Sequence, residues 1–175
     1  DRALLHVRLP RPYHTGERLQ VTIAFATRLP EAKNWGHYRG SVALDGLWYP
    51  TLVPYRQGVW VWGLHESLHA HYTLRFTAAA EQQALASVPW TARMQQHGWQ
   101  TLTGSAGPLY HLGLSLSTRG HLEEDLTHVP PLRVLLPAAD APEARHLLQT
   151  LRGALVFYQQ ALALTVPAPL LTVVV

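Results

Sequence analysis

Cysteine is absent from the 175-residue chain, and lysine occurs only once, at Lys33. The lack of cysteine excludes a disulfide framework, a thiolate zinc site and a cysteine nucleophile, while the compartment stays unknown. The 14 Lys and Arg residues are scattered singly among 11 Asp and Glu, so no basic run follows a phosphate backbone. We therefore expect no nucleic-acid partner.

Long apolar runs are also missing. No uninterrupted apolar stretch approaches the roughly 18 residues that a membrane-spanning helix needs, so we expect no membrane segment in this chain. Charged residues make up only 14% of the sequence and apolar residues 47%. This balance is the opposite of a disordered segment, and the chain is long enough to bury a core.

An apolar period of two dominates residues 4–136. In residues 18–27 it places Leu19, Val21, Ile23 and Phe25 on one face of an extended segment. Further strands are predicted at residues 4–9, 47–53, 59–62, 71–76, 85–88, 99–103, 109–117 and 132–136, separated by turn signals that include residues 14–17, 57–58 and 104–108. Many short strands at this spacing predict a mostly-β fold, an antiparallel β-sandwich.

The period becomes helical from Asp140 to about Leu164. Asp140 and Glu143 form a capping-box pattern, and Pro167 and Pro169 end the helix. The apolar stripe of this helix consists of Ala144, Leu147, Leu148, Leu151, Leu155, Tyr158 and Leu162. We therefore predict a β-sandwich domain over residues 1–138, followed by a helix and a strand over residues 139–175.

Residues 170–175 are β-branched and apolar on both faces, as in a strand buried within a mixed sheet. Because natural termini are usually polar, we expect the chain to be a piece of a longer parent protein. The strand then packs back on its own domain, pairs with a second copy, or stays exposed. Pairing between copies, giving a homo-oligomer, is the outcome we expect.

One string carries chemistry: His65, Glu66, Ser67, Leu68 and His69 match the H-E-x-x-H pattern of zinc peptidases. That chemistry needs a helix, which brings both imidazoles to one metal with the Glu as base. Strand-like residues on both sides leave about eight residues for a helix, below the mean of about 11. No third ligand follows at a known spacing, so we interpret the string as a chance match in a loop and keep a zinc site as the alternative.

In an extended segment, His69 and His71 share the solvent-facing side of a strand, where they are ordinary polar residues or a chelating pair. Glu123, Glu124 and Asp125 are interpreted as a solvated loop, with an acidic binding patch as the alternative. Aromatic residues crowd the first third of the chain: Trp35, Tyr38, Trp48, Tyr49, Tyr55, Trp60 and Trp62. Sheet core accounts for most of them, and a sugar- or peptide-binding platform is the alternative.

A family resemblance enters through four motifs in a fixed order. Residues 9–17, with the sequence LPRPYHTGE, resemble a stretch in the N-terminal β-domain of gluzincin zinc aminopeptidases, the group of aminopeptidase N and leukotriene hydrolase. Residues 46–50 resemble the aromatic-Pro segment of this family, and residues 72–78 with 85–87 resemble one of its strand pairs. Residues 154–174 resemble the helix and strand with which its catalytic domain begins.

The resemblance implies a non-catalytic domain that packs on the catalytic domain and walls its substrate cleft. The zinc helix of the family lies beyond the equivalent of Val175, so zinc is expected in the parent and no cofactor in this chain. Ser41 stands where a Gln or Glu holds the substrate amine, which indicates a divergent bacterial member or an inactive relative. The alternatives are an autonomous zinc hydrolase using His65, Glu66 and His69, with His71 as a further candidate ligand, and a β-sandwich binding module with an aromatic platform.

Overall fold

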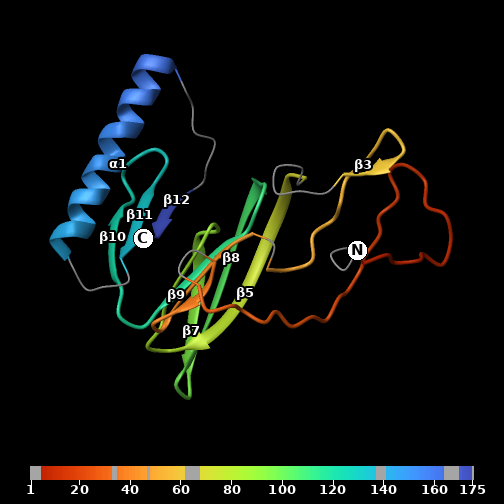
Figure 1. The fold of residues 1–175 in the computed structure, drawn as a ribbon, viewed down its shortest axis with the longest axis horizontal. Helices are drawn as coiled ribbons and strands as arrows, with labels where there is room; N and C mark the ends of the chain where they lie inside the picture. Colours follow the sequence, from red (N-terminus) through yellow and green to blue (C-terminus); the bar gives the residue numbers. More distant parts are fainter. Residues whose placement is uncertain are drawn as a thin grey trace.

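The computed structural model describes residues 5–32, 35–46, 48–61, 68–136, 141–163 and 170–174. The predicted mostly-β fold with one helix and a C-terminal strand is confirmed (Figure 1). The elements are β1 (Gly36–Tyr38), β2 (Ser41–Asp45), β3 (Tyr55–Arg56), β4 (Val59–Trp60), β5 (Ala70–Ala79), β6 (Gln83–Ala86), β7 (Trp90–Gln96), β8 (Trp99–Leu109), β9 (Gly113–Ser117), β10 (His121–Asp125), β11 (Leu132–Leu136), α1 (Ala141–Leu162) and β12 (Leu171–Val174). Within the described ranges, no helix has the length and apolar character to cross a membrane.

Three two-residue hairpins organise the first part of the chain. β1 joins β2 through Arg39-Gly40, β3 joins β4 through Gln57-Gly58, and β7 joins β8 through His97-Gly98. Both residues of each loop have positive φ, between 49° and 84°. This is the type I′ turn, whose twist matches that of the paired strands and which favours glycine at its second position.

Two antiparallel sheets face each other across a first hydrophobic cluster. One has the strand order β1-β2-β9-β6 and the other β5-β8-β7. The buried members of this cluster are Leu44, Ala86, Val88, Leu112 and Leu114. Tyr72, Leu74 and Phe76 of β5 pack against them with alternating burial along the strand, as the period of two predicts.

The predicted turn at residues 104–108 is wrong, because these residues lie inside β8. Gly104 and Gly107 instead allow the neighbouring strands to approach the backbone of β8 closely. A Cβ on Gly104 would lie 2.2 Å from the carbonyl oxygen of Pro89, and one on Gly107 would lie 2.6 Å from the Cα of His71. The register of β8 shifts opposite both places, as at a β-bulge.

A second hydrophobic cluster lies between α1 and the sheet β10-β11-β12. β11 pairs antiparallel with β10 and parallel with β12, with Leu132 opposite Leu171. The predicted strand over residues 132–136 is confirmed, and the predicted helix is confirmed over residues 141–162. β12 pairs with β11 of its own chain, and the homo-oligomer expected through this strand stays a prediction.

Two predicted N-terminal strands are absent from the fold. Residues 5–9 and 18–27 are assigned to no strand, and the apolar side chains of the second segment are exposed. Figure 1 draws this part as a long trace without arrows. Residues 48–53 are likewise outside any strand, and β9 begins at Gly113 rather than at residue 109. Alternating apolar residues determine which face of a strand is buried. A strand also needs a neighbouring strand that forms hydrogen bonds with its backbone N–H and C=O groups.

Candidate functional site

The zinc-peptidase motif is described only in part. His65 and Glu66 lie outside the described residues. His69 is exposed, and its ring centroid lies 3.7 Å from that of Tyr110. His71 is exposed on the outer face of β5, where the sequence places it. Across the described part of the chain, no three His, Asp or Glu side chains are grouped so that they could hold a metal ion. The interpretation of the complete motif stays a prediction.

Trp62 lies outside the described residues, and five of the other six crowded aromatic residues fall into two groups. Trp35, Trp48 and Tyr49 pack against the first hydrophobic cluster, as expected for sheet core. Tyr55 and Trp60 are 59% and 51% exposed and face each other across the β3–β4 hairpin, with ring centroids 4.8 Å apart. Only this second group has the exposure that a binding platform requires.

The aromatic-Pro segment braces the two sheets. Trp48 donates from Nε1 to the carbonyl of Leu112 over 2.8 Å, and the amide of Leu112 donates to the hydroxyl of Tyr49 over 2.9 Å. Tyr49 in turn donates to the hydroxyl of Tyr72 on β5 over 3.1 Å. The three aromatic rings meet edge to face, with centroids 5.0 and 5.9 Å apart. Both backbone groups of Leu112 are thereby satisfied next to the core.

The hydroxyl of Tyr49 lies at the centre of this brace. Burial raises the pKa of its hydroxyl well above the usual range, and the hydrogen bond with Tyr72 adds to this rise. Because the phenol therefore stays protonated at neutral pH, it acts as a hydrogen-bonding link and not as a base.

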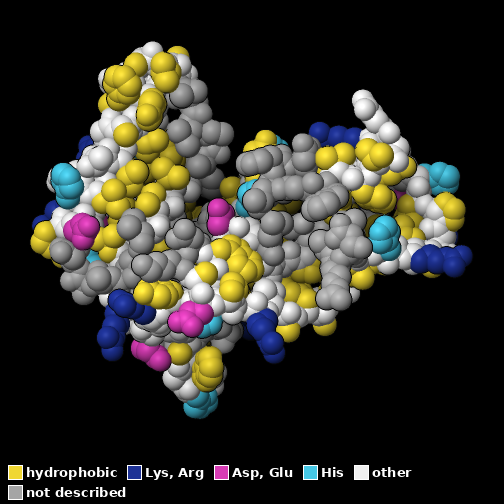
Figure 2. Space-filling model, viewed as in Figure 1, with side chains coloured by type: hydrophobic (Ala, Val, Ile, Leu, Met, Phe, Trp, Pro, Cys, Tyr) yellow, Lys and Arg dark blue, Asp and Glu magenta, His cyan; other side chains and the backbone are white. Residues whose placement is uncertain are grey.

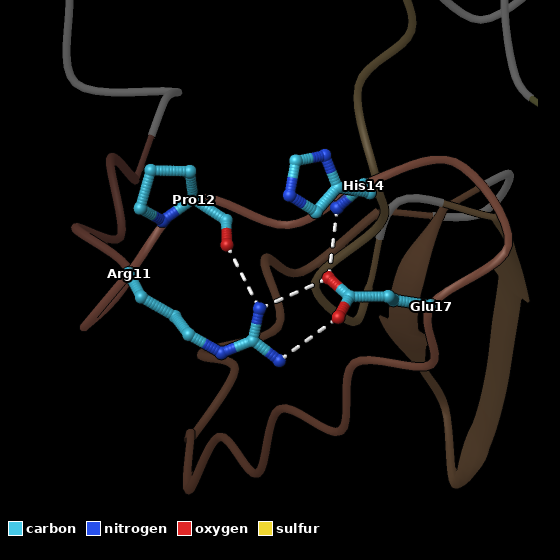
Figure 3. Close-up of polar contacts among 4 residues, drawn as sticks. All are labelled: Arg11, Pro12, His14 and Glu17. Carbon is cyan, nitrogen blue, oxygen red and sulfur yellow. Dashed lines mark hydrogen bonds and ion pairs between the residues drawn. The ribbon is translucent and has the colours of Figure 1, made fainter.

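The LPRPYHTGE motif closes on itself (Figure 3). Arg11 binds both carboxylate oxygens of Glu17, at 3.0 and 3.1 Å, and also donates to the carbonyl of Pro12. The amide of His14 donates to the same carboxylate over 2.8 Å. The Arg11 guanidinium and this amide lower the pKa of Glu17. Since its charged groups satisfy each other, the motif is a structural turn.

The acidic residues 123–125 form no loop, which corrects the prediction from sequence. They lie in β10, and each carboxylate has basic partners. Glu123 contacts His121 at 2.9 Å and Arg145 at 3.6 Å. Glu124 pairs with Arg133, and Asp125 lies 3.4 Å from Arg152. The row therefore ties β10 to β11 and α1.

Sequence spacing could have indicated this arrangement. Arg145 and Arg152 are seven residues apart, which places them on one face of a helix, and Glu123 and Asp125 are two apart, which places them on one face of a strand. Two basic residues on a helix then match two acidic residues on a neighbouring strand. The prediction failed because residues 123–125 were not recognised as a strand.

Ser41 opens β2 opposite Ser117 of β9. The two hydroxyl oxygens lie 3.3 Å apart, in a cross-strand contact within the sheet. Ser41, where the resemblance predicts the loss of an amine anchor, therefore makes a contact within the sheet.

Two hollows are found among the described residues. One, of about 360 Å³, lies between β12 and the strands β2, β6 and β9, and Asp45 and Thr172 line it. The other, of about 570 Å³, is lined by charged side chains that include Glu81, Arg93 and Arg133. Neither hollow includes His69 or His71.

Comparison with known proteins gives a likeness to solved structures alone. No family model matches the chain, and no curated protein matches it. The chain is similar to an M1 zinc metallopeptidase from Deinococcus radiodurans. It is 22% identical to that structure with a TM-score of 0.47, covering 86% of this chain and 35% of the metallopeptidase. A point mutant of that enzyme with a bound Tyr-Ser-Ala substrate gives 20% identity, a TM-score of 0.49 and the same coverage. The chain thus spans about a third of these structures.

Proposed function

We propose that the chain is the non-catalytic N-terminal domain of an aminopeptidase-like zinc metallopeptidase, and that it packs on the catalytic domain and walls the substrate cleft. The ordered motifs support this assignment. In the structure, the first motif forms the Arg11–Glu17 turn and the second braces the sheets through Trp48 and Tyr49. Residues of the third motif lie in β5 and β6, and the fourth motif forms part of α1 and β12. The side chains described in the first two motifs make structural contacts within the domain.

The observation that carries the docking part of the proposal is the uncovered end of α1. Leu148, Leu151 and Leu155 pack against the second cluster, but the last two turns of the helix continue past it. There Phe157 and Leu162 are 61% and 58% exposed. Figure 2 shows apolar side chains gathered over this helix. An exposed apolar group of this kind marks an interaction surface, and we assign it to the catalytic domain of the parent.

Binding in trans tests this docking. The chain and the remainder of the parent are produced separately, and their affinity is measured by biolayer interferometry. Phe157→Asp and Leu162→Asp should each weaken binding about tenfold or more, because a charge would be buried at the contact. Gln149→Asp, on an exposed face of the same helix, is the matched control and should leave the affinity unchanged. Equal affinities for all three variants would contradict the proposal.

A second candidate function rests on the exposed pair Tyr55 and Trp60. In this alternative the chain is a binding module, and the β3–β4 hairpin stacks on a sugar ring or an apolar peptide side chain. Titration with oligosaccharides and peptides while Trp fluorescence is followed tests it. A saturable change that is lost in Trp60→Ala would favour the module, and an unchanged spectrum would remove it.

A further inference from the structure

The hollow of about 570 Å³ lies where three sheets meet, and its walls come from β6, β7 and the strand pair β10–β11. Trp90 fixes one corner, because its Nε1 donates to the carbonyl of Ala84 over 2.8 Å and holds the start of β7 beside β6. The volume is within the range of roughly 300–1,000 Å³ that is typical of small-ligand sites. The hollow therefore has room for a molecule of dipeptide size.

Two charged side chains of opposite sign line this hollow. Arg93 of β7 pairs with Leu102 of β8, which is fully buried, and residues opposite each other share a face of a sheet. Arg93 is therefore on the inner side of its sheet, yet it is exposed because β7 is an outer strand. Glu81, in the turn that joins β5 to β6, lines the same hollow and is also exposed.

The third wall has a charged pair that neutralises itself. Glu124 of β10 lies opposite Arg133 of β11 and forms an ion pair with it. The residues on either side of Arg133 belong to the second cluster under α1, so Arg133 points away from the helix. By contrast, Glu81 and Arg93 have no ion-pair partner among the described residues. These two opposite charges are therefore available to a ligand.

We propose that this hollow binds a zwitterion of dipeptide size, a short peptide with both termini free. Its ammonium group pairs with the carboxylate of Glu81, and its carboxylate pairs with the guanidinium of Arg93. A ligand with a single charge would leave one of these side chains unpaired and would meet a like charge there. Trp90 and Leu122 supply apolar surface for a side chain of the peptide.

This inference does not depend on the proposed function. None of the described residues that line the hollow belongs to α1, where docking of the catalytic domain is proposed. Failure of peptide binding and failure of docking are therefore separate results.

Three forms of one dipeptide test the pairing of charges. Gly-Leu has both charges, N-acetyl-Gly-Leu only the carboxylate, and Gly-Leu amide only the ammonium group. Each is titrated into the isotope-labelled full chain, and its affinity is measured from amide chemical shifts in NMR spectra. Gly-Leu should bind saturably with a Kd of about 1 mM or tighter, and each blocked form about three- to fivefold more weakly, which is the effect of one exposed ion pair.

Two variants assign each terminus of the peptide to its side chain. In Glu81→Gln, acetylation of the peptide should no longer lower the affinity, whereas amidation should still do so. In Arg93→Gln the two effects should be exchanged. Arg119→Gln removes an exposed cation that does not line the hollow, so this matched control should bind all three peptides as the unmodified chain does.

Equal affinities of the three peptides for the unmodified chain would overturn the proposal, as would the absence of saturable shifts at about 20 mM Gly-Leu. This comparison stands even if a variant misfolds. Binding that is unchanged in both Glu81→Gln and Arg93→Gln would place the peptide outside the hollow. Saturable shifts confined to the β3–β4 hairpin would also overturn the proposal, in favour of the aromatic binding module.

Discussion

The two hydrophobic clusters of this chain are joined to their surroundings by different polar contacts. The first is braced by neutral hydrogen bonds from Trp48 and Tyr49 to the backbone of Leu112. The second is flanked by ion pairs, which join Arg145 and Arg152 of α1 to carboxylates of β10. Neutral, partly buried hydrogen bonds respond little to acid or salt, whereas exposed ion pairs respond to both. The helix layer should therefore be the region that solution conditions release.

Two probes report separately on these regions. All six tryptophans lie between residues 35 and 99, so fluorescence follows the first cluster and its sheets. The helix α1 covers the second cluster, so far-UV circular dichroism follows that region. Urea titrations read by both probes thus compare the two clusters within one sample.

The largest effect is expected from truncating a buried leucine in each cluster. Leu132 is fully buried under α1, and Leu132→Ala should cost about 2–5 kcal/mol because it leaves a cavity. Its matched partner is Leu114→Ala in the first cluster. Leu132→Ala should lower the dichroism midpoint most, and Leu114→Ala the fluorescence midpoint. Equal shifts of both midpoints in both variants would mean that the two clusters unfold as one unit.

A smaller effect is expected at the aromatic brace. Tyr49→Phe removes the acceptor for the amide of Leu112 and the donor to Tyr72, at a cost of about 1–3 kcal/mol in the free energy of unfolding. Tyr55→Phe, at an exposed ring, is the control and should change stability by less than about 0.5 kcal/mol. If the two variants lost equal stability in urea titrations read by fluorescence, the brace would not be a stabilising contact.

A stabilising change is available in the helix. Gly153 lies within α1, and a Cβ there would meet no atom within 4 Å. Gly153→Ala should stabilise the helix layer by about 0.5–1 kcal/mol, since glycine loses more backbone freedom on folding. Gly104→Ala is the opposing control, because its Cβ would meet the carbonyl of Pro89. If Gly153→Ala instead lowered the urea midpoint measured by circular dichroism, this position would have a contact that the structure does not contain.

Acid should loosen the helix layer first, by a small amount. Hydrogen bonds from His121 and Thr127 lower the pKa values of Glu123 and Asp125 below their usual range. A depressed folded-state pKa gives stability above the unfolded value that is lost as the pH falls through the folded value. Dichroism should therefore decline below about pH 4 before fluorescence changes, and Glu123→Gln with Asp125→Asn should flatten this dependence. If dichroism and fluorescence declined at the same pH, the two clusters would not differ in their response to acid.

The sequence predicted the elements whose pattern is dense and local. Residues 132–136 and the helix have long apolar runs or stripes that fix element type without knowledge of partners. β7 was missed because its side chains, from Thr91 to Gln96, are exposed and it lies at a sheet edge. Residues 104–108 were misassigned because glycine there permits close packing and not a turn.

The candidate site shows the same division. The solvent-facing position of His71 followed from alternation along β5, which is a local property. The links from Tyr49 to Leu112 and from Arg152 to Asp125 join residues 63 and 27 positions apart. No local pattern fixes such a pairing, since it depends on how the sheets are ordered. Residues 18–27 show the same limit. Their apolar alternation indicates which side chains would share a face, but it does not determine which strand they would pair with.

Zinc content and peptidase turnover of the isolated chain test the central claim, that this domain performs no chemistry of its own. The purified chain is incubated with zinc, its bound metal is measured by mass spectrometry, and hydrolysis of aminoacyl substrates is followed, with Glu66→Gln and His65→Ala as variants. We expect no stoichiometric zinc, no turnover and the same behaviour in all three proteins. Stoichiometric zinc lost in His65→Ala, together with turnover abolished in Glu66→Gln, would contradict it and identify an autonomous zinc hydrolase.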